Sequence, residues 1–183
     1  HIFTWTNGLM TDLQPGETFN YTAKAISSDG NVIAGFGGPA GLAFRFQAGV
    51  VTPLLPFGTD QASFAFGISG DGTTVVGESC GTNSTLTCSA TEWLANGTAA
   101  TLLASPAVAG MTGSQANGVN KDGSVVVGSA ITATGGRAVY WTGGTAYDLG
   151  SIAGPSSQTN ASAGAAAVTP DGQLVVGASS VTV

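Results

Sequence analysis

Two glutamates, Glu78 and Glu92, flank two cysteines, and this spacing is the arrangement in the chain best suited to acid–base chemistry. If Cys80 and Cys88 pair directly across a hairpin, the two glutamates become diagonal neighbours on one face, roughly 7–8 Å apart at the backbone. Paired carboxyl groups in glycoside hydrolases lie about 5–9.5 Å apart. The pattern therefore allows a carbohydrate-active or other hydrolase. The simpler interpretation is two solvated glutamates on an outer hairpin.

Cys80 and Cys88 are the only cysteines, and they bracket a segment rich in glycine, asparagine and threonine, which is typical of a loop. We predict that they form a disulfide, which would contribute about 2.5 kcal/mol through loop closure. The alternative is two free thiols. A disulfide favours an oxidising, extracellular location. Two thiols and one distant histidine are too few ligands for a zinc site.

Other catalytic and metal-binding sets are incomplete. The chain has no G-x-S-x-G segment, and its one histidine, His1, is terminal, so a Ser-His-Asp arrangement and a copper-binding histidine brace both lack a part. Four aspartates recur at one repeat position and could form an acidic ring for a cation, but each precedes a glycine, so a turn explains them. They are Asp29, Asp71, Asp122 and Asp171. We predict no metal and no cofactor.

Length varies between the repeats in segments that we expect to lie on one end of the fold. These are 53–63, 103–114, 150–162 and 80–88. Loops on a rigid scaffold often carry binding residues. Phe57, Asp60 and Phe64 interrupt the repeat with aromatic and charged groups, and we therefore predict them as ligand-binding residues. The other interpretation is that these rings pack only against their own loop.

The composition excludes several classes of protein. Among 183 residues there are 4 Lys and Arg, 10 Asp and Glu, and 29 Gly, with a net charge of −6 and 43% hydrophobic residues. So few basic residues cannot neutralise a phosphate backbone, which argues against nucleic-acid binding. The hydrophobic content argues against a disordered chain. No apolar run is long enough for a transmembrane helix, and we find no signal peptide.

One phrase occurs four times and predicts a hairpin each time. It combines a small residue, an Asp-Gly pair and a β-branched run ending in glycine, as in Gly67–Gly77 and Gly118–Gly128. Asp-Gly between apolar runs is a strong hairpin signal. An alanine lies six residues before each aspartate, and we expect this column to lie on the innermost strands. Its members are Ala23, Ala65, Ala116 and Ala165.

A second phrase also occurs four times and ends in a large aromatic residue, which we expect to fill the space between repeats. The aromatic residues are Trp5, Phe46, Trp93 and Trp141. A turn with glycine and then a leucine follow each one, which predicts a second hairpin. Two hairpins make a four-stranded unit.

The order of the phrases predicts an all-β, four-bladed β-propeller. The chain begins with a second hairpin and ends with a first one, so we expect strands from both termini to close the last blade, with Val183 near His1. The predicted division is one domain, 1–183, with half-blades at 1–14 and 151–183 and full blades at 15–55, 56–103 and 104–150. A β-solenoid is the alternative.

The paired phrases resemble the bacterial HAF-type extracellular repeat, found in secreted proteins and in passenger regions of autotransporters. The resemblance covers essentially the whole chain, and His1-Ile2-Phe3 and Leu42-Ala43-Phe44 come nearest to the His-Ala-Phe tripeptide. It implies a β-rich fold at the bacterial cell surface and supplies no catalytic residues. We expect the natural chain to extend beyond one or both ends.

These observations favour a non-enzymatic, extracellular binding or display module that recognises a glycan or protein. The alternatives are a hydrolase that uses Glu78 and Glu92, or loop carboxylates such as Asp60 and Asp148, and a purely structural stalk.

Overall fold

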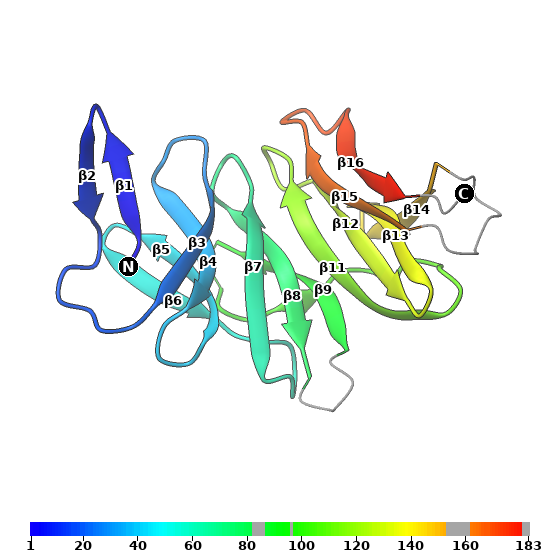
Figure 1. Ribbon diagram of the computed structural model, residues 1–183, viewed down its shortest axis with the longest axis horizontal. Coiled ribbons are helices and arrows are strands. Elements are labelled where there is room, and N and C mark those ends of the chain that lie inside the picture. The colour runs from blue at the N-terminus through cyan, green and yellow to red at the C-terminus, as the bar shows by residue number, and fades with distance from the viewer. Residues whose placement is uncertain (82–86, 96, 153–161, 181–183) are drawn as a thin grey trace.

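The strands of the chain form antiparallel β-sheets that lie side by side in an arc (Figure 1). The computed structural model describes residues 1–81, 87–95, 97–152 and 162–180. No helix occurs among the described residues, so none of them forms a helix able to cross a membrane. The predicted all-β, propeller-like fold is thus confirmed in its class.

Three complete blades form the centre of the arc, and each is a meander of four antiparallel strands. The first contains β3 (Tyr21–Ile26), β4 (Val32–Gly37), β5 (Leu42–Gln47) and β6 (Val50–Leu54). The second contains β7 (Ala62–Ile68), β8 (Thr74–Cys80), β9 (Cys88–Leu94) and β10 (Thr101–Leu102). The third contains β11 (Met111–Val119), β12 (Val125–Thr132), β13 (Gly135–Thr142) and β14 (Thr145–Gly150).

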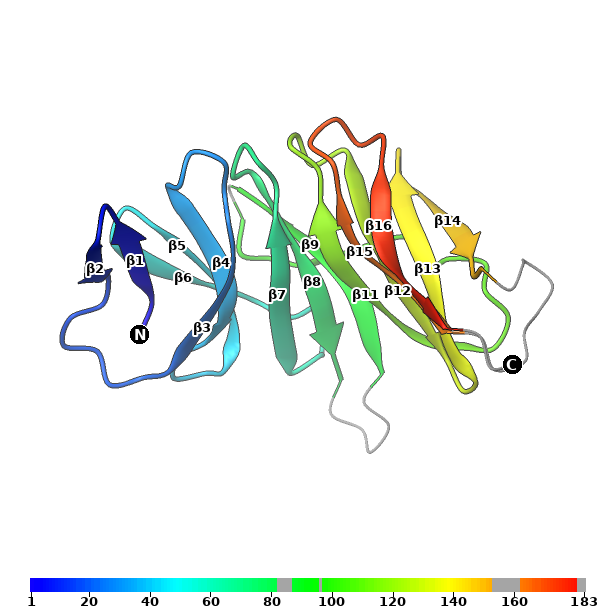
Figure 2. The ribbon, with the colours of Figure 1, turned by 45° about the horizontal axis from the view of Figure 1, so that its top comes forward.

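Two hairpins flank these blades. β1 (Phe3–Thr6) pairs with β2 (Leu9–Asp12), and β15 (Ser162–Val168) pairs with β16 (Val175–Ser180). The two hairpins form separate sheets and lie toward opposite ends of the molecule in both views (Figures 1 and 2).

The predicted closing of a fourth blade by both termini is therefore wrong for this structure, although Val183 itself lies outside the described residues. Phrase order determines which hairpin follows which, but it carries no information about the angle between neighbouring blades. In this structure the three complete blades keep the terminal hairpins apart, at opposite ends of the arc (Figure 1).

The Asp-Gly hairpins form as the sequence predicts, and they align along one edge of the arc (Figure 1). In the second blade, Asp71 Oδ1 accepts hydrogen bonds from the Ser69 hydroxyl at 2.6 Å and from the Thr73 backbone N–H at 2.9 Å. Gly72 follows with a φ of 74°, a conformation that glycine adopts without strain.

Backbone hydrogen bonds connect these turns from one blade to the next. The Ser28 N–H donates to the Gly70 carbonyl, the Asp71 N–H to the Lys121 carbonyl, and the Lys121 N–H to the Pro170 carbonyl. The first strands of neighbouring blades also lie side by side and form the inner edge of the arc. The alanine column lies on these strands, as expected.

The apolar core is divided among the boundaries between blades. Between the first and second blades, Val32 and Leu54 pack with Ala65 and Trp93. A matching cluster that contains Trp141 lies between the second and third blades. At the amino-terminal end, Ile2 packs against Phe44 and Phe46. Each blade is thus stabilised mainly by the apolar face of its neighbour.

Candidate functional site

Each first strand contains a β-bulge at the same repeat position. The register shifts between Ala23 and Ala25, and at the equivalent step in β7, β11 and β15. Bulges redirect a side chain and often lie beside functional sites. The residues at the extra position are Lys24, Phe66, Asn117 and Ala166. Unlike the alanine before it, this position varies in chemistry from blade to blade.

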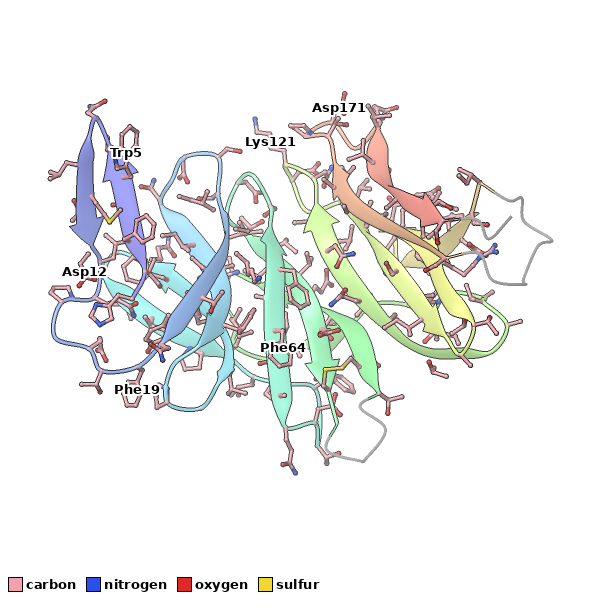
Figure 3. The ribbon with its side chains drawn as sticks, in the orientation of Figure 1. Trp5, Asp12, Phe19, Phe64, Lys121 and Asp171 are labelled. Carbon is pink, nitrogen blue, oxygen red and sulfur yellow. A yellow bond between two sulfur atoms is a disulfide. The ribbon has the colours of Figure 1, made fainter. Side chains whose placement is uncertain are left out.

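Three phenylalanine rings meet where the first blade contacts the second. The ring of Phe36 on β4 lies 5.3 Å from that of Phe64 and 6.5 Å from that of Phe66, edge to face in both pairs. The Lys24 ammonium lies 5.4 Å from the centre of the Phe36 ring, a cation–π distance. All three rings are half-buried, and Figure 3 labels Phe64 in the central blade.

A half-buried carboxylate extends this group toward the third blade. Glu78 on β8 lies directly opposite Phe64 in the register, and the Gln115 side-chain amide donates a 3.3 Å hydrogen bond to Glu78 Oε2. Burial raises the pKa of Glu78, and the hydrogen bond from Gln115 opposes this shift. We call Lys24, Phe36, Phe64, Phe66, Glu78 and Gln115 the aromatic–acid cluster. It spans three blades and combines apolar faces with hydrogen-bonding groups.

Phe57 and Asp60, predicted with Phe64 as ligand-binding residues, lie next to this blade in the connection from β6 to β7. The buried Ser79 hydroxyl donates to Asp60 Oδ2 at 2.6 Å and accepts from the Phe57 backbone N–H at 2.8 Å. Asp60 therefore anchors the connection, while the Phe57 ring is exposed. Of the three residues, Phe64 belongs to the aromatic–acid cluster.

The cysteines are paired, as predicted, with Cys80 opposite Cys88. This register places Glu78 opposite Ala90 and Glu92 opposite Val76. Loop residues 82–86 between the cysteines lie outside the described residues.

Glu92 lies in different surroundings from Glu78. It lines a groove of about 510 Å³ with Ser124 and Trp141 of the third blade, and Glu78 does not line this groove. Burial raises the pKa of Glu92 as well. Asp148, the other carboxylate considered for catalysis, forms an ion pair with Arg137 at 2.8 Å. In the described structure, Glu78, Glu92 and Asp148 thus each lie in a different environment.

The remaining metal-binding candidates have structural partners. Among the described residues, the one group of side chains close enough to hold an ion is Glu78, Cys80 and Cys88, and its two sulfurs are joined in the disulfide. His1 places Nδ1 2.8 Å from Asp12 Oδ2 and Nε2 2.9 Å from the Glu17 carbonyl oxygen. The turn aspartates accept hydrogen bonds within their own turns.

Sequence reasoning missed Phe36, Phe66, Gln115 and Lys24. Phe36 follows the repeated glycine Gly35 directly, where the other units have Glu78, Ser129 and Ala178, and this departure from the repeat was the available signal. The contacts of these four residues cross from one blade to the next, so the contacts depend on the angle at which neighbouring blades pack.

No family model matches the chain, and none of the curated protein sequences does. Among solved structures, a protein from Agrobacterium tumefaciens assigned as TolB aligns with a TM-score of 0.58 and 18% identity, over 92% of this chain and 57% of that one. TolB from Acinetobacter baumannii aligns with a TM-score of 0.57 and 11% identity, over 94% and 41%. A prolyl endopeptidase aligns with a TM-score of 0.57 and 11% identity, over 87% and 26%.

These structures are similar to this chain in fold alone, because every identity is low and the set includes an enzyme as well as TolB proteins. The chain spans about 57% of the first and about 41% of the second. The comparison supports an all-β, propeller-like fold that matches part of a larger structure in each case.

Proposed function

We propose that this chain is a non-enzymatic binding module that acts outside the cytoplasm, and that the aromatic–acid cluster is its ligand site. The observation that supports this most directly is the contact of Phe36 on β4 with Phe64 on β7, together with Glu78 on β8 opposite Phe64. Half-buried rings offer apolar faces, while a carboxylate and an amide accept and donate hydrogen bonds. A glycan or a protein segment with hydroxyl or amine donors fits this chemistry.

The charge of the chain narrows the ligand class. Its net charge is −6, and Glu78 has no cationic partner among the described residues that would neutralise it. This charge repels an anionic ligand and attracts a basic segment, and it places no penalty on a neutral sugar. The same charge supports the expectation that nucleic acid is not a partner.

The location outside the cytoplasm is supported by the Cys80–Cys88 disulfide, because such bonds persist in oxidising compartments. The resemblance to HAF-type repeats supports the same location, at the cell surface or in the surrounding medium. Membership of that repeat family is part of the proposal.

Hydrolysis is the second candidate, favoured by one observation. Burial raises the pKa of both Glu78 and Glu92, which is the change that a general acid needs. Their separate surroundings favour binding over catalysis. A purely structural stalk is the third candidate, to be chosen if neither activity is found.

Binding can be tested with fluorescently labelled chain on a glycan array and on an array of extracellular protein fragments. We expect a signal that Phe64→Ala and Gln115→Ala abolish. Phe19→Ala is the matched control, because Phe19 is an exposed ring outside the cluster (Figure 3). Equal loss in all three variants, or a signal unaffected by Phe64→Ala, would reject the site.

A panel of glycoside and ester substrates tests the alternative. Turnover that is lost in both Glu78→Gln and Glu92→Gln would replace the binding proposal with a hydrolase. Circular dichroism of each variant separates loss of the site from loss of the fold.

A further inference from the structure

The two terminal hairpins are complementary halves of one blade. In β15–β16, Ala165 pairs with Gly177 as Ala65 pairs with Gly77 in the first two strands of the second blade. β1–β2 has instead the register of the last two strands of a blade. There the Leu13 N–H donates to the Ile2 carbonyl at 3.0 Å, as the Leu103 N–H does to the Ala90 carbonyl at 2.9 Å.

The amino-terminal half exposes side chains that complete blades bury. Trp5 is 64% exposed, whereas Trp93 and Trp141 at the same repeat position are 0% and 3% exposed. Phe3 is also exposed, although Phe44 at its repeat position is buried. Figure 3 shows Trp5 on β1, at the end of the arc. In a complete blade, the first two strands lie beside the third strand and bury these side chains. The β1–β2 hairpin lacks those two strands.

The carboxy-terminal half shows the reverse deficiency. Val176 on β16 is 53% exposed, whereas Val76 and Val127 at the same position are both 0% exposed. In complete blades this strand pairs with the third strand along its whole length. In β16 that edge is unpaired among the described strands. Unpaired edges are templates for strand addition.

A groove lies at each open half. One of about 480 Å³ is lined by Ser151, Ala165 and Val175, where a third strand would lie beside β16. The other, of about 460 Å³, is lined by Phe3, Trp5 and Ala23, where a second strand would lie beside β1. Each groove thus lies where a complete blade has a strand. The hairpin at the opposite end of the chain contains that strand.

The tryptophan side chain gives a more specific match. Trp93 Nε1 donates to the Leu55 carbonyl at 2.8 Å, and Trp141 Nε1 donates to the Ala104 carbonyl at 2.7 Å. Leu55 and Ala104 each come one residue after the leucine that lies opposite an alanine of the third strand, as Leu54 lies opposite Ala43. In the third blade Gly150 lies opposite Ala138, so the acceptor position is Ser151. Ser151 lines the first groove and has a buried hydroxyl without a partner. Trp5 Nε1 has no partner among the described residues.

We propose that two copies of this chain associate head to tail, with β1–β2 of one copy completing the blade that β15–β16 of the other begins. The occupant is a second copy because the chain carries the matching hairpin at its other end, too far away to reach its own β16 (Figures 1 and 2). A contact between different surfaces closes into a ring if its rotation allows. With two such contacts, β1 of each copy pairs with β16 of the other.

The register of the join follows from the complete blades. Val75 pairs with Trp93 in the second blade, and Val126 pairs with Trp141 in the third. The equivalent pair across the join is Val175 with Trp5, which places Val176 opposite Thr4. Trp5 would then complete a further cluster between blades, against Ala165 and Val175.

The first test is the mass of the 183-residue chain by sedimentation equilibrium. We expect a dimer of twice the 17.9 kDa monomer, which Trp5→Ala and Val176→Asp each weaken about tenfold or more. Leu9→Ala is the matched control, because Leu9 lies on the same hairpin at a position that stays exposed in Val50 of the first blade. A monomer at all concentrations would overturn the proposal. Iodide quenching of tryptophan fluorescence would then tell whether Trp5 is exposed to solvent or covered by its own chain, and either result would leave the proposal overturned.

Cross-linking tests the direction of the join. A chain with Thr4→Cys and a chain with Val176→Cys should form a disulfide-linked dimer when mixed and oxidised, whereas neither should cross-link alone. Self-linking of the Thr4→Cys chain would mean that like ends meet, and would overturn the proposal.

Complementation keeps the test independent of folding. A mixture of Trp5→Ala and Val176→Asp chains retains one intact pair of ends, so it should dimerise where each variant alone does so weakly. No recovery on mixing, with both variants folded by circular dichroism, would contradict a head-to-tail join.

Discussion

The indole N–H of Trp93 donates to the Leu55 carbonyl at 2.8 Å, across the boundary between the first two blades. Trp93 is fully buried there, among side chains from both blades. The same position thus supplies apolar area and a hydrogen bond, which makes it the main lateral contact of the repeat.

Trp93→Phe should lower the free energy of unfolding by about 1–3 kcal/mol, because the Leu55 carbonyl loses its donor in a buried setting. Urea denaturation followed by circular dichroism measures the change. Tyr147→Phe, which removes a hydroxyl from an exposed ring, should leave the midpoint unchanged. Equal midpoints for the wild type and Trp93→Phe would show that the hydrogen bond contributes little.

Reduction of the Cys80–Cys88 disulfide should lower the free energy of unfolding by about 2.5 kcal/mol, because the bond restricts a short loop in the unfolded chain. The comparison is urea denaturation with and without a phosphine reductant. The double variant Cys80→Ala, Cys88→Ala should have the lower stability already and should not respond to the reductant. A response of that variant would point to an effect elsewhere in the chain.

Acid should destabilise the fold through the four turn aspartates. In Asp71 the hydrogen bond from the Ser69 hydroxyl is the largest cause of a pKa below the ordinary value of 3.8. The hydroxyls of Ser27, Ser124 and Thr169 act in the same way on the other three. A lowered pKa means that the stabilisation is complete above pH 3.8 and is lost as pH falls through the lower folded-state pKa.

The melting temperature should therefore fall as the solution is titrated below about pH 4. Asp71→Asn should lower the melting temperature at neutral pH and make this fall shallower. If the acid profiles of the wild type and the variant are parallel, the turns do not cause the acid sensitivity.

Glu78 should act in the opposite direction at higher pH. Burial raises its pKa above the ordinary value of 4.5, so folding disfavours its ionised form. This cost is present at neutral pH and disappears as pH falls through the raised pKa toward 4.5. Stability should thus increase slightly on mild acidification. Because burial raises the pKa of Glu92 as well, Glu78→Gln should make that increase smaller, and the double variant Glu78→Gln, Glu92→Gln should remove it in urea titrations compared across this range.

The hairpins were predictable because their signals are local. Asp71-Gly72 and the β-branched run after it define a turn and two strands without reference to the rest of the chain. The Cys80–Cys88 pairing also sets its own register, so the diagonal placement of Glu78 and Glu92 followed from spacing.

The arc and the candidate site depend on contacts that spacing does not encode. Whether four units close depends on how side chains such as Val32 and Trp93 fit between blades. Phe36 and Gln115 join the site only because their blades pack beside the second one. Comparing the spacing of residues between repeats treats neighbouring units as identical, whereas these contacts form at positions where the units differ in sequence.

The backbone hydrogen bonds from turn to turn, beginning with Ser28 to Gly70, make the chain a linear array of units that are stabilised by their neighbours. In such an array, cooperativity spreads from unit to unit, and a terminal unit has one neighbour where an inner unit has two. Amide protons of β8 and β9 should therefore exchange with solvent only on global unfolding. In the monomeric form favoured by Trp5→Ala, those of β1 and β2 should exchange through fraying, at a rate that is independent of the central blades.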